Sequence, residues 1–392
     1  MSDQPARGRK DGAPEQARTR QPAGRGTDQD LGLKVAVRRL LWRMGCSTRI
    51  DVRLRGYVEG DPRGQAAYDF TDLDVLGIGF TPAGQLHTTF ADCRTTKDKF
   101  VERMFWVRGV ADFVAADDAY MVRSTPVPAV TRTLSSRLNV GVLAPDDLAA
   151  LERTFATELD LSGPLAVLFD LGGVQTHLNN YDNADKKLDN LLDYLNFDYW
   201  VYDPYRNLSQ LVARLADVVA VLDPQNRQHR ALFYDCAWHY ALAVARAVAF
   251  ARSSRMGEVP TAVRTYVGGG ELALREKAGL AQLLKHHGFP DVDNSVILPP
   301  YIDQLVELVN RFLVRPLELA EVMRYAEYLA VSEPNRVEAS VGAAFGTHVR
   351  PIAAKLLADV CGFLVTAAGL RPEFRTAARA RLVLDLTGGD PK

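Results

Sequence analysis

The pattern of apolar and polar residues between 30 and 155 predicts alternating helices and strands. Apolar residues at helical spacing predict a first helix that stops at Gly45, namely Leu33, Val37, Leu40, Leu41 and Met44. Strands are predicted at about 50–58, 68–80 and 87–94, with a hairpin turn at 81–84 between the last two. A helix from about 97 to 113 and a strand at 119–123 follow, and a further strand and helix are expected within 139–155. The order is helix, three strands, helix, strand.

From about residue 156 the strand patterns give way to long helical ones. Apolar residues recur there at steps of three and four, which is typical of amphipathic helices. Helices are predicted at 186–195, 208–222, 228–253, 271–287, 300–330 and 354–368. The segment 300–330 should be two helices, because Pro316 removes a backbone donor and clashes with the preceding turn. The sequence therefore predicts an α/β domain at 30–155 and an all-helical domain at 156–392.

Two aspartates stand out in the second and third predicted strands. Asp74 follows Thr-Asp-Leu in the first of them, and Asp92 precedes Cys93 and Arg94 in the next. Residues two apart on a strand point to the same face, so Asp92 and Arg94 should project together while Cys93 points into apolar surroundings. The hairpin turn brings Asp74 toward Asp92. Paired carboxylates beside a cation are suited to holding a divalent metal against a phosphodiester.

This order of elements and these acidic strands resemble the PD-(D/E)XK restriction-endonuclease-like nucleases. The resemblance covers roughly residues 30–135: Asp74 lies in a segment like the family's acid-apolar-Asp-Val strand, and Asp92-Cys93-Arg94 falls at the (D/E)XK triplet. It implies a restriction-endonuclease-like fold, in which a mixed sheet is flanked by helices. Arg94 stands where the family usually has lysine.

The resemblance also implies a metal-dependent hydrolysis of DNA. Asp74 and Asp92 would bind Mg²⁺ or Mn²⁺, Asp72 would be a further or alternative ligand, and water would be the nucleophile. The electrostatic partner would be Arg94 or, from a migrated position, Lys97. Such an enzyme would cut bacterial or foreign DNA in restriction, repair or phage defence.

Two other interpretations of these residues stay open. The aspartates can be solvent-facing strand residues, although Asp74 and Asp92 have apolar neighbours among which an unpaired carboxylate is costly. Arginine is always protonated and presents a planar fork, so Arg94 favours a catalytically degenerate nuclease fold. That protein would bind nucleic acid or another protein without cutting.

The formal net charge of -1, taken over the whole chain, gives no support to nucleic-acid binding. The distribution of charge along the chain gives some support. Basic residues predominate in the first helix, where Lys34, Arg38, Arg39 and Arg43 are expected to form a positive surface for a phosphate backbone. Residues 1–29 carry six basic and four acidic side chains with almost no apolar ones, and are expected to be a disordered basic tail. DNA is the expected partner, and RNA stays open.

The remaining composition indicates a cytoplasmic protein that does not enter membranes. The 392 residues are 47% hydrophobic, which suffices for two cores. The four cysteines lie far apart without a CxxC pair, which fits a reducing compartment. No run of about 18 apolar residues is present, so no membrane span is expected. The helical domain is expected to recognise substrate, a partner protein or a second copy of the chain.

Overall fold

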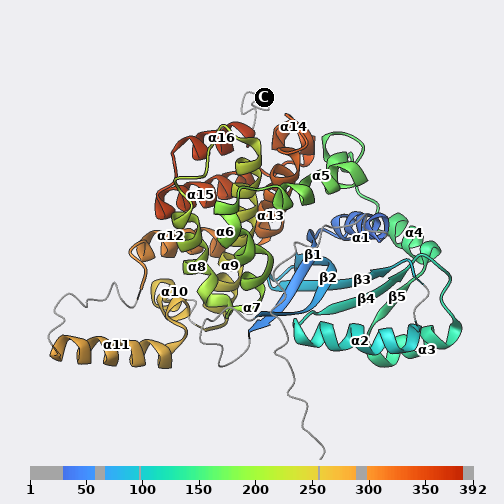
Figure 1. The fold of residues 1–392 in the computed structure, drawn as a ribbon, viewed down its shortest axis with the longest axis horizontal. Coiled ribbons are helices and arrows are strands. Elements are labelled where there is room, and N and C mark those ends of the chain that lie inside the picture. The colour runs from blue at the N-terminus through green and yellow to red at the C-terminus, as the bar shows by residue number, and fades with distance from the viewer. Residues whose placement is uncertain (1–29, 58–66, 97–98, 255–256, 288–297, 383–392) are drawn as a thin grey trace, which may run out of the picture.

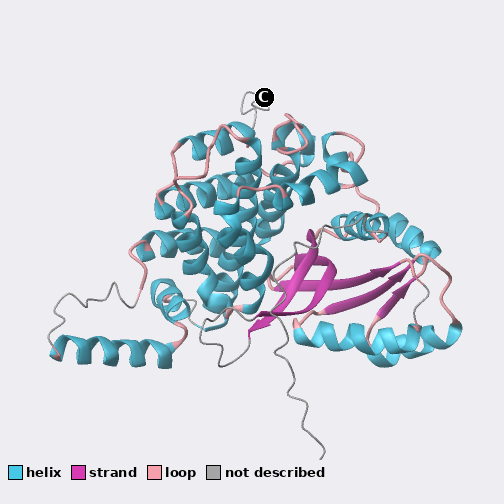
Figure 2. Ribbon diagram, in the orientation of Figure 1, coloured by secondary structure: helices cyan, strands magenta, loops and turns pink. Residues whose placement is uncertain are grey.

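The computed structural model describes residues 30–57, 67–96, 99–254, 257–287 and 298–382. In this part of the chain a five-stranded mixed sheet with flanking helices is followed by a larger, entirely helical part (Figure 1, Figure 2). The predicted order of helix, three strands, helix and strand is confirmed. The predicted basic tail, residues 1–29, and Lys97 lie outside the described residues.

The sheet and its helices occupy the first part of the described chain. Their bounds are α1 Leu31–Arg43, β1 Ser47–Tyr57, β2 Ala67–Phe80, β3 Leu86–Arg94, α2 Phe100–Phe113, β4 Asp118–Arg123, α3 Ala129–Leu138, β5 Gly141–Leu143 and α4 Pro145–Thr154. Helix α1 ends at Arg43, and the predicted stop, Gly45, follows two residues later with a positive φ of 88°, the left-handed conformation that closes helices. Helix α3 was not predicted, because only Thr131 in it is buried and its pattern is correspondingly weak.

The strands follow their order in the chain, β1-β2-β3-β4-β5. The pairs β1–β2 and β2–β3 are antiparallel, whereas β3–β4 and β4–β5 are parallel. Helices α1 and α4 cover one face of the sheet and α2 and α3 the other (Figure 1). Cys93 is buried among residues of α1 and the sheet, including Val37, Leu41 and Val75, so its predicted inward orientation is confirmed.

The helical part begins after a 3-10 turn, Pro164–Leu168. Its α-helices are α5 Leu171–Asp182, α6 Asp189–Asp193, α7 Tyr199–Val201, α8 Asn207–Asp217, α9 Arg227–Ser254, α10 Val259–Gly268, α11 Glu271–His286, α12 Ile302–Val314, α13 Leu319–Ser332, α14 Val341–Phe345, α15 Pro351–Ala368 and α16 Glu373–Arg381. The predicted break at Pro316 is confirmed, since α12 ends before it and α13 begins after it. The segment 186–195 is not one helix: a 3-10 turn, α6 and a π-helical turn at Tyr194–Asp198 share it.

Strand β1 is the edge of the sheet that faces the helical part. Contacts with α13 and α7 cover it, so its open edge is shielded from further pairing. One hydrophobic core runs from the sheet into the helices: it includes Trp42 of α1, Leu54 of β1, Trp238 of α9 and Tyr325 of α13. The two parts are therefore packed as one body.

Helix α15 is the one described helix that is long and apolar enough to cross a membrane. Its residues Leu357, Val360 and Leu364 are buried against neighbouring helices, as in the core of a soluble protein. The four cysteines, Cys46, Cys93, Cys236 and Cys361, are all buried free thiols.

Candidate functional site

Three aspartates stand side by side on strands β1, β2 and β3. Strand β2 pairs with β3 up to Val75 and Ala91, which places Asp74 opposite Asp92 at the next position, where the pairing ends. On its other side β2 pairs with β1 through Ile50–Val75 and Val52–Leu73, which places Asp51 opposite Asp74. Asp74 is thus the middle member of a row of carboxylates. The expected approach of Asp74 and Asp92 follows from the register of one hairpin.

Asp74 is buried and held from two sides. Its Oδ2 accepts a hydrogen bond of 2.7 Å from the backbone N–H of Cys93, and Lys34 Nζ lies 3.2 Å from its Oδ1. Burial raises the pKa of Asp74 to about 6, with Asp92 acting in the same direction and Lys34 opposing it. Its proton affinity is therefore far above that of an exposed aspartate. A solvent-facing role does not describe Asp74, which is 3% exposed.

Lys34 of α1 also contacts Asp51, which the sequence analysis did not select. Its Nζ donates to Asp51 Oδ1 at 2.6 Å, so one ammonium bridges two members of the row. Asp51 has a positive φ of 58° inside strand β1. This conformation is uncommon for a residue with a side chain and costs about 1–3 kcal/mol, a form of strain that is frequent at functional sites. Carboxylate oxygens of Asp51, Asp72 and Asp74 lie within 4.8 Å of one another, close enough to share a metal ion.

Asp92 is surrounded by arginines. Arg103 of α2 donates to both of its carboxylate oxygens, with distances of 2.5 Å from Nη2 and 3.2 Å from Nε. Arg94 Nε and Arg123 Nη2 lie 3.7 and 3.6 Å from the carboxylate. The Arg103 guanidinium also stacks on Trp106, with its Cζ 3.5 Å from the ring centre. Asp92 is thus neutralised by protein cations.

Arg94 lies beside Asp92 and links the site to the start of α1. It is partly exposed, and its Nη1 lies 3.7 Å from Asp30 Oδ2. Asp30 in turn accepts hydrogen bonds of 2.6 Å from the backbone and the hydroxyl of Thr95. The end of β3 is therefore fastened to the beginning of the helix that supplies Lys34.

The predicted positive surface on α1 is wrong for two of its four residues. Lys34 and Arg38 are each 4% exposed, because acidic partners on other elements draw them inward. Arg39 is held by Glu152 of α4 at 2.7 Å, and Arg43 is partly buried. Arg38 reaches Glu327 of the helical part, whereas Lys34 contacts Asp51 and Asp74 of the sheet.

Among the residues that the sequence analysis missed, Asp51 left the clearest signal. In the segment Arg49-Ile-Asp-Val-Arg-Leu-Arg55 the polar positions are all arginine except Asp51. Arg103 had no comparable signal, because its place near Asp92 depends on how α2 crosses the sheet.

The chain matches no model of a known protein family, no curated protein and no solved structure. What it does must therefore be argued from the geometry of these side chains.

Proposed function

We propose that this protein is a metal-dependent phosphodiesterase of restriction-endonuclease-like fold that cleaves DNA. The observation that carries the proposal is the juxtaposition of Asp74 and Asp92 where β2 and β3 stop pairing, with Lys34 in contact with Asp74. The order of the elements and the parallel return of β4 beside β3 agree with the fold that the sequence resemblance implies. Restriction, repair or phage defence in the cytoplasm would be the setting.

The residues of the row fit Mg²⁺ or Mn²⁺. Both ions prefer hard oxygen ligands, and carboxylate oxygens of Asp51, Asp72 and Asp74 lie within 4.8 Å of one another. Asp92 would be the ligand from β3. When bound, such a metal supplies a water that is readily deprotonated and a charge that polarises the phosphate.

The protein's own residues would then supply the positive charge around the phosphate. Lys34 offers a compact ammonium on a flexible stem, which is the group that Arg94 lacks. We therefore assign to Lys34 the role that the sequence analysis gave to Lys97. Arg94, which is partly exposed beside Asp92, would stabilise negative charge that develops on the phosphate oxygens.

A second candidate function is a nuclease fold that binds without cutting. The specific observation in its favour is the two-pronged contact of Arg103 with Asp92, which uses the oxygens that a metal would need. In that case the site is an internal salt-bridge network and the partner is held elsewhere.

Cleavage of supercoiled plasmid and single-stranded DNA with Mg²⁺ or Mn²⁺ tests the first proposal. Asp74→Ala and Asp92→Ala should abolish cutting, and Arg94→Lys should preserve or increase it. Arg103→Met separates the two candidates: release of Asp92 should raise Mn²⁺ affinity in an enzyme. In a binding protein it should only lower stability. If the wild-type protein, Arg94→Lys and Arg103→Met all fail to cut either DNA, the enzyme proposal falls.

A further inference from the structure

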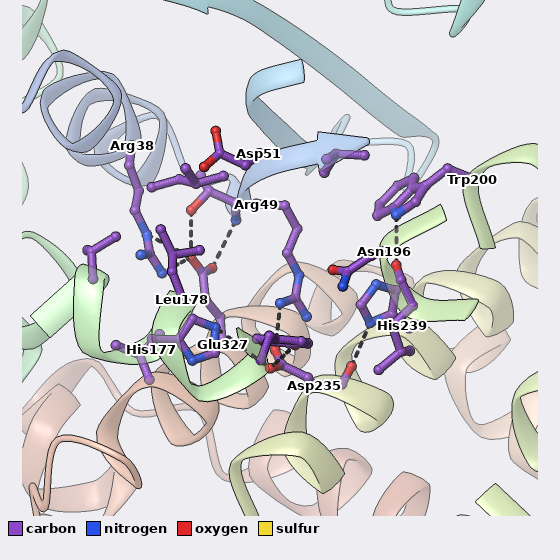
Figure 3. Close-up of a pocket in the computed structure, with 17 residues that line it drawn as sticks. Arg38, Arg49, Asp51, His177, Leu178, Asn196, Trp200, Asp235, His239 and Glu327 are labelled. Carbon is purple, nitrogen blue, oxygen red and sulfur yellow. Dashed lines mark hydrogen bonds and ion pairs between the residues drawn. The ribbon is translucent and has the colours of Figure 1, made fainter. Parts of the chain in front are cut away.

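A single carboxylate from the helical part reaches into the junction between α1 and β1. Glu327 of α13 is 2% exposed and accepts six hydrogen bonds. The donors are Arg38 Nε and Nη2 at 3.2 and 2.7 Å, Trp42 Nε1 at 3.0 Å, Ser47 Oγ at 2.7 Å, and Thr48 N and Oγ1 at 2.9 and 2.5 Å. All of these donors belong to the segment 38–48, and Figure 3 shows Glu327 pointing toward it.

A second buried carboxylate binds Arg49, the residue that follows this segment. Asp235 of α9 accepts a hydrogen bond of 2.5 Å from Arg49 Nη1 and another from the Tyr181 hydroxyl (Figure 3). The neighbouring Trp238 donates to Ser47 Oγ at 2.7 Å, and its ring packs under the Arg49 guanidinium, with 4.2 Å between the Arg49 Cζ and the ring centre. The helical part therefore forms hydrogen bonds with the side chain or backbone of every residue from Ser47 to Arg49.

The segment that the helical part binds, residues 38–49, lies between two members of the candidate site. Lys34 precedes Arg38 by one helical turn, and Asp51 follows Arg49 by two residues. Asp51 is in the strained conformation with φ of 58°, which a strand does not keep unless its surroundings impose it. A shift of the junction between α1 and β1 would move Lys34 and Asp51 relative to Asp74, which is fixed separately by the backbone of Cys93.

We infer that Glu327 is a positioning residue that holds Lys34 and Asp51 against Asp74, so that the helical part completes the metal site of the sheet. The inference rests on the proposed function and assigns the helical part a role in it. A carboxylate suits this task because both of its oxygens accept hydrogen bonds and it carries no hydrogen, and here it meets only donors. Glutamine would bring an NH₂ group against Trp42 Nε1, Ser47 Oγ or the Thr48 N–H.

Glu333 provides a matched control in the same helical part. It is 1% exposed at the end of α13, and its Oε2 accepts from Arg230 at 2.8 and 3.1 Å. Its partners belong to the helical part, so Glu333→Gln also breaks a buried ion pair without touching the α1–β1 junction. Thr48→Val is a milder variant at the junction, which removes one hydroxyl donor to Glu327 and leaves the carboxylate in place.

The test is the Mn²⁺ affinity of the full-length protein, measured by calorimetry for wild type, Glu327→Gln, Glu333→Gln and Thr48→Val. Loss of an outer support of a metal ligand typically costs about 10–100-fold in affinity, and we expect about tenfold or more for Glu327→Gln. Glu333→Gln should stay near the wild-type value. If Glu327→Gln does not fold, Thr48→Val is the test variant, and a weaker Mn²⁺ affinity than in wild type supports the inference. Equal affinities in the junction variants and Glu333→Gln would overturn the inference.

Backbone hydrogen exchange separates a failure of the inference from a failure of the proposed function. Glu327→Gln should speed exchange in residues 49–52, and Glu333→Gln should not. If wild type binds no Mn²⁺, the metal-site proposal falls. In that case selective loss of protection at 49–52 in Glu327→Gln still supports the positioning role of Glu327 at the junction. Unchanged protection overturns that role as well.

Discussion

Lys34 Nζ lies 3.2 Å from Asp74 Oδ1, so a cation from α1 balances the charge of the neighbouring Asp51 and Asp74. Lys34→Met would leave Asp51 and Asp74 to repel each other inside the protein. Loss of one partner from a buried ion pair costs about 3–5 kcal/mol of folding free energy. We expect a lower denaturation midpoint at pH 8, and a larger Mn²⁺-induced rise in Tm than in wild type, because the ion replaces the missing charge. An equal rise in both proteins would show that the row does not bind the metal.

Asp74→Asn should stabilise the protein while removing any activity. The buried Asp74 has a pKa of about 6 against 3.8 unfolded, so its ionised form costs about 3 kcal/mol at pH 8. Asparagine avoids this cost, and its oxygen can still accept from the Cys93 N–H. Wild type takes up a proton on folding between pH 6 and 4, so the advantage of the variant should shrink over that range and vanish below pH 4. Urea unfolding of both proteins at pH 8, 6 and 4 measures the difference in their free energies of unfolding. A variant less stable than wild type at pH 8 would contradict the prediction.

Arg38→Met should lower stability, although the sequence analysis placed Arg38 on a DNA-binding surface. Its guanidinium is buried against Glu327, so its loss should cost about 3–5 kcal/mol. Arg39→Met is the control on the same helix: its pair with Glu152 is partly exposed and should contribute about 1 kcal/mol or less. Chemical denaturation of both variants decides the matter. A weaker DNA affinity in Arg38→Met without loss of stability would restore the earlier interpretation.

His177 should make the protein sensitive to acid. Burial lowers its pKa to about 4, with Asp235 opposing this effect, while an unfolded histidine titrates near 6.5. The unfolded chain therefore binds the proton first, and the contribution of His177 to stability should fall by about 3 kcal/mol as the pH drops from 6.5 to 4. His177→Gln should flatten this part of the stability curve relative to wild type. A parallel pair of curves would show that the pKa of His177 is the same in the folded and the unfolded protein.

Local patterns in the sequence predicted the strands and the pairing of the acids well. Asp74 and Asp92 lie on one hairpin, so turn position and strand periodicity were enough to bring them together. The break at Pro316 followed equally from a local rule. The helices that were not predicted include α3, in which only Thr131 is buried, and α14, which is only five residues long.

The surroundings of the acids could not be predicted in the same way. Lys34 and Arg38 have the spacing of a solvated helix face, and only Asp51, Asp74 and Glu327 show why they are buried. Glu327 follows Arg38 by 289 residues, and no local rule links positions so far apart. A charged residue at a polar-looking helix position is assigned to water unless its distant partner is known.

The distance along the chain between Ser47 and Glu327 also sets an order of events during synthesis. The two residues are separated by 280 positions, so their hydrogen bond cannot form until most of the protein has left the ribosome. The sheet can begin to pair early, whereas the junction that holds Asp51 must await α13, since contacts between distant segments form late. An unfinished chain would thus carry the acidic residues without the arrangement that the complete protein imposes on them. In a protein that cuts DNA, this delay would keep incomplete copies harmless.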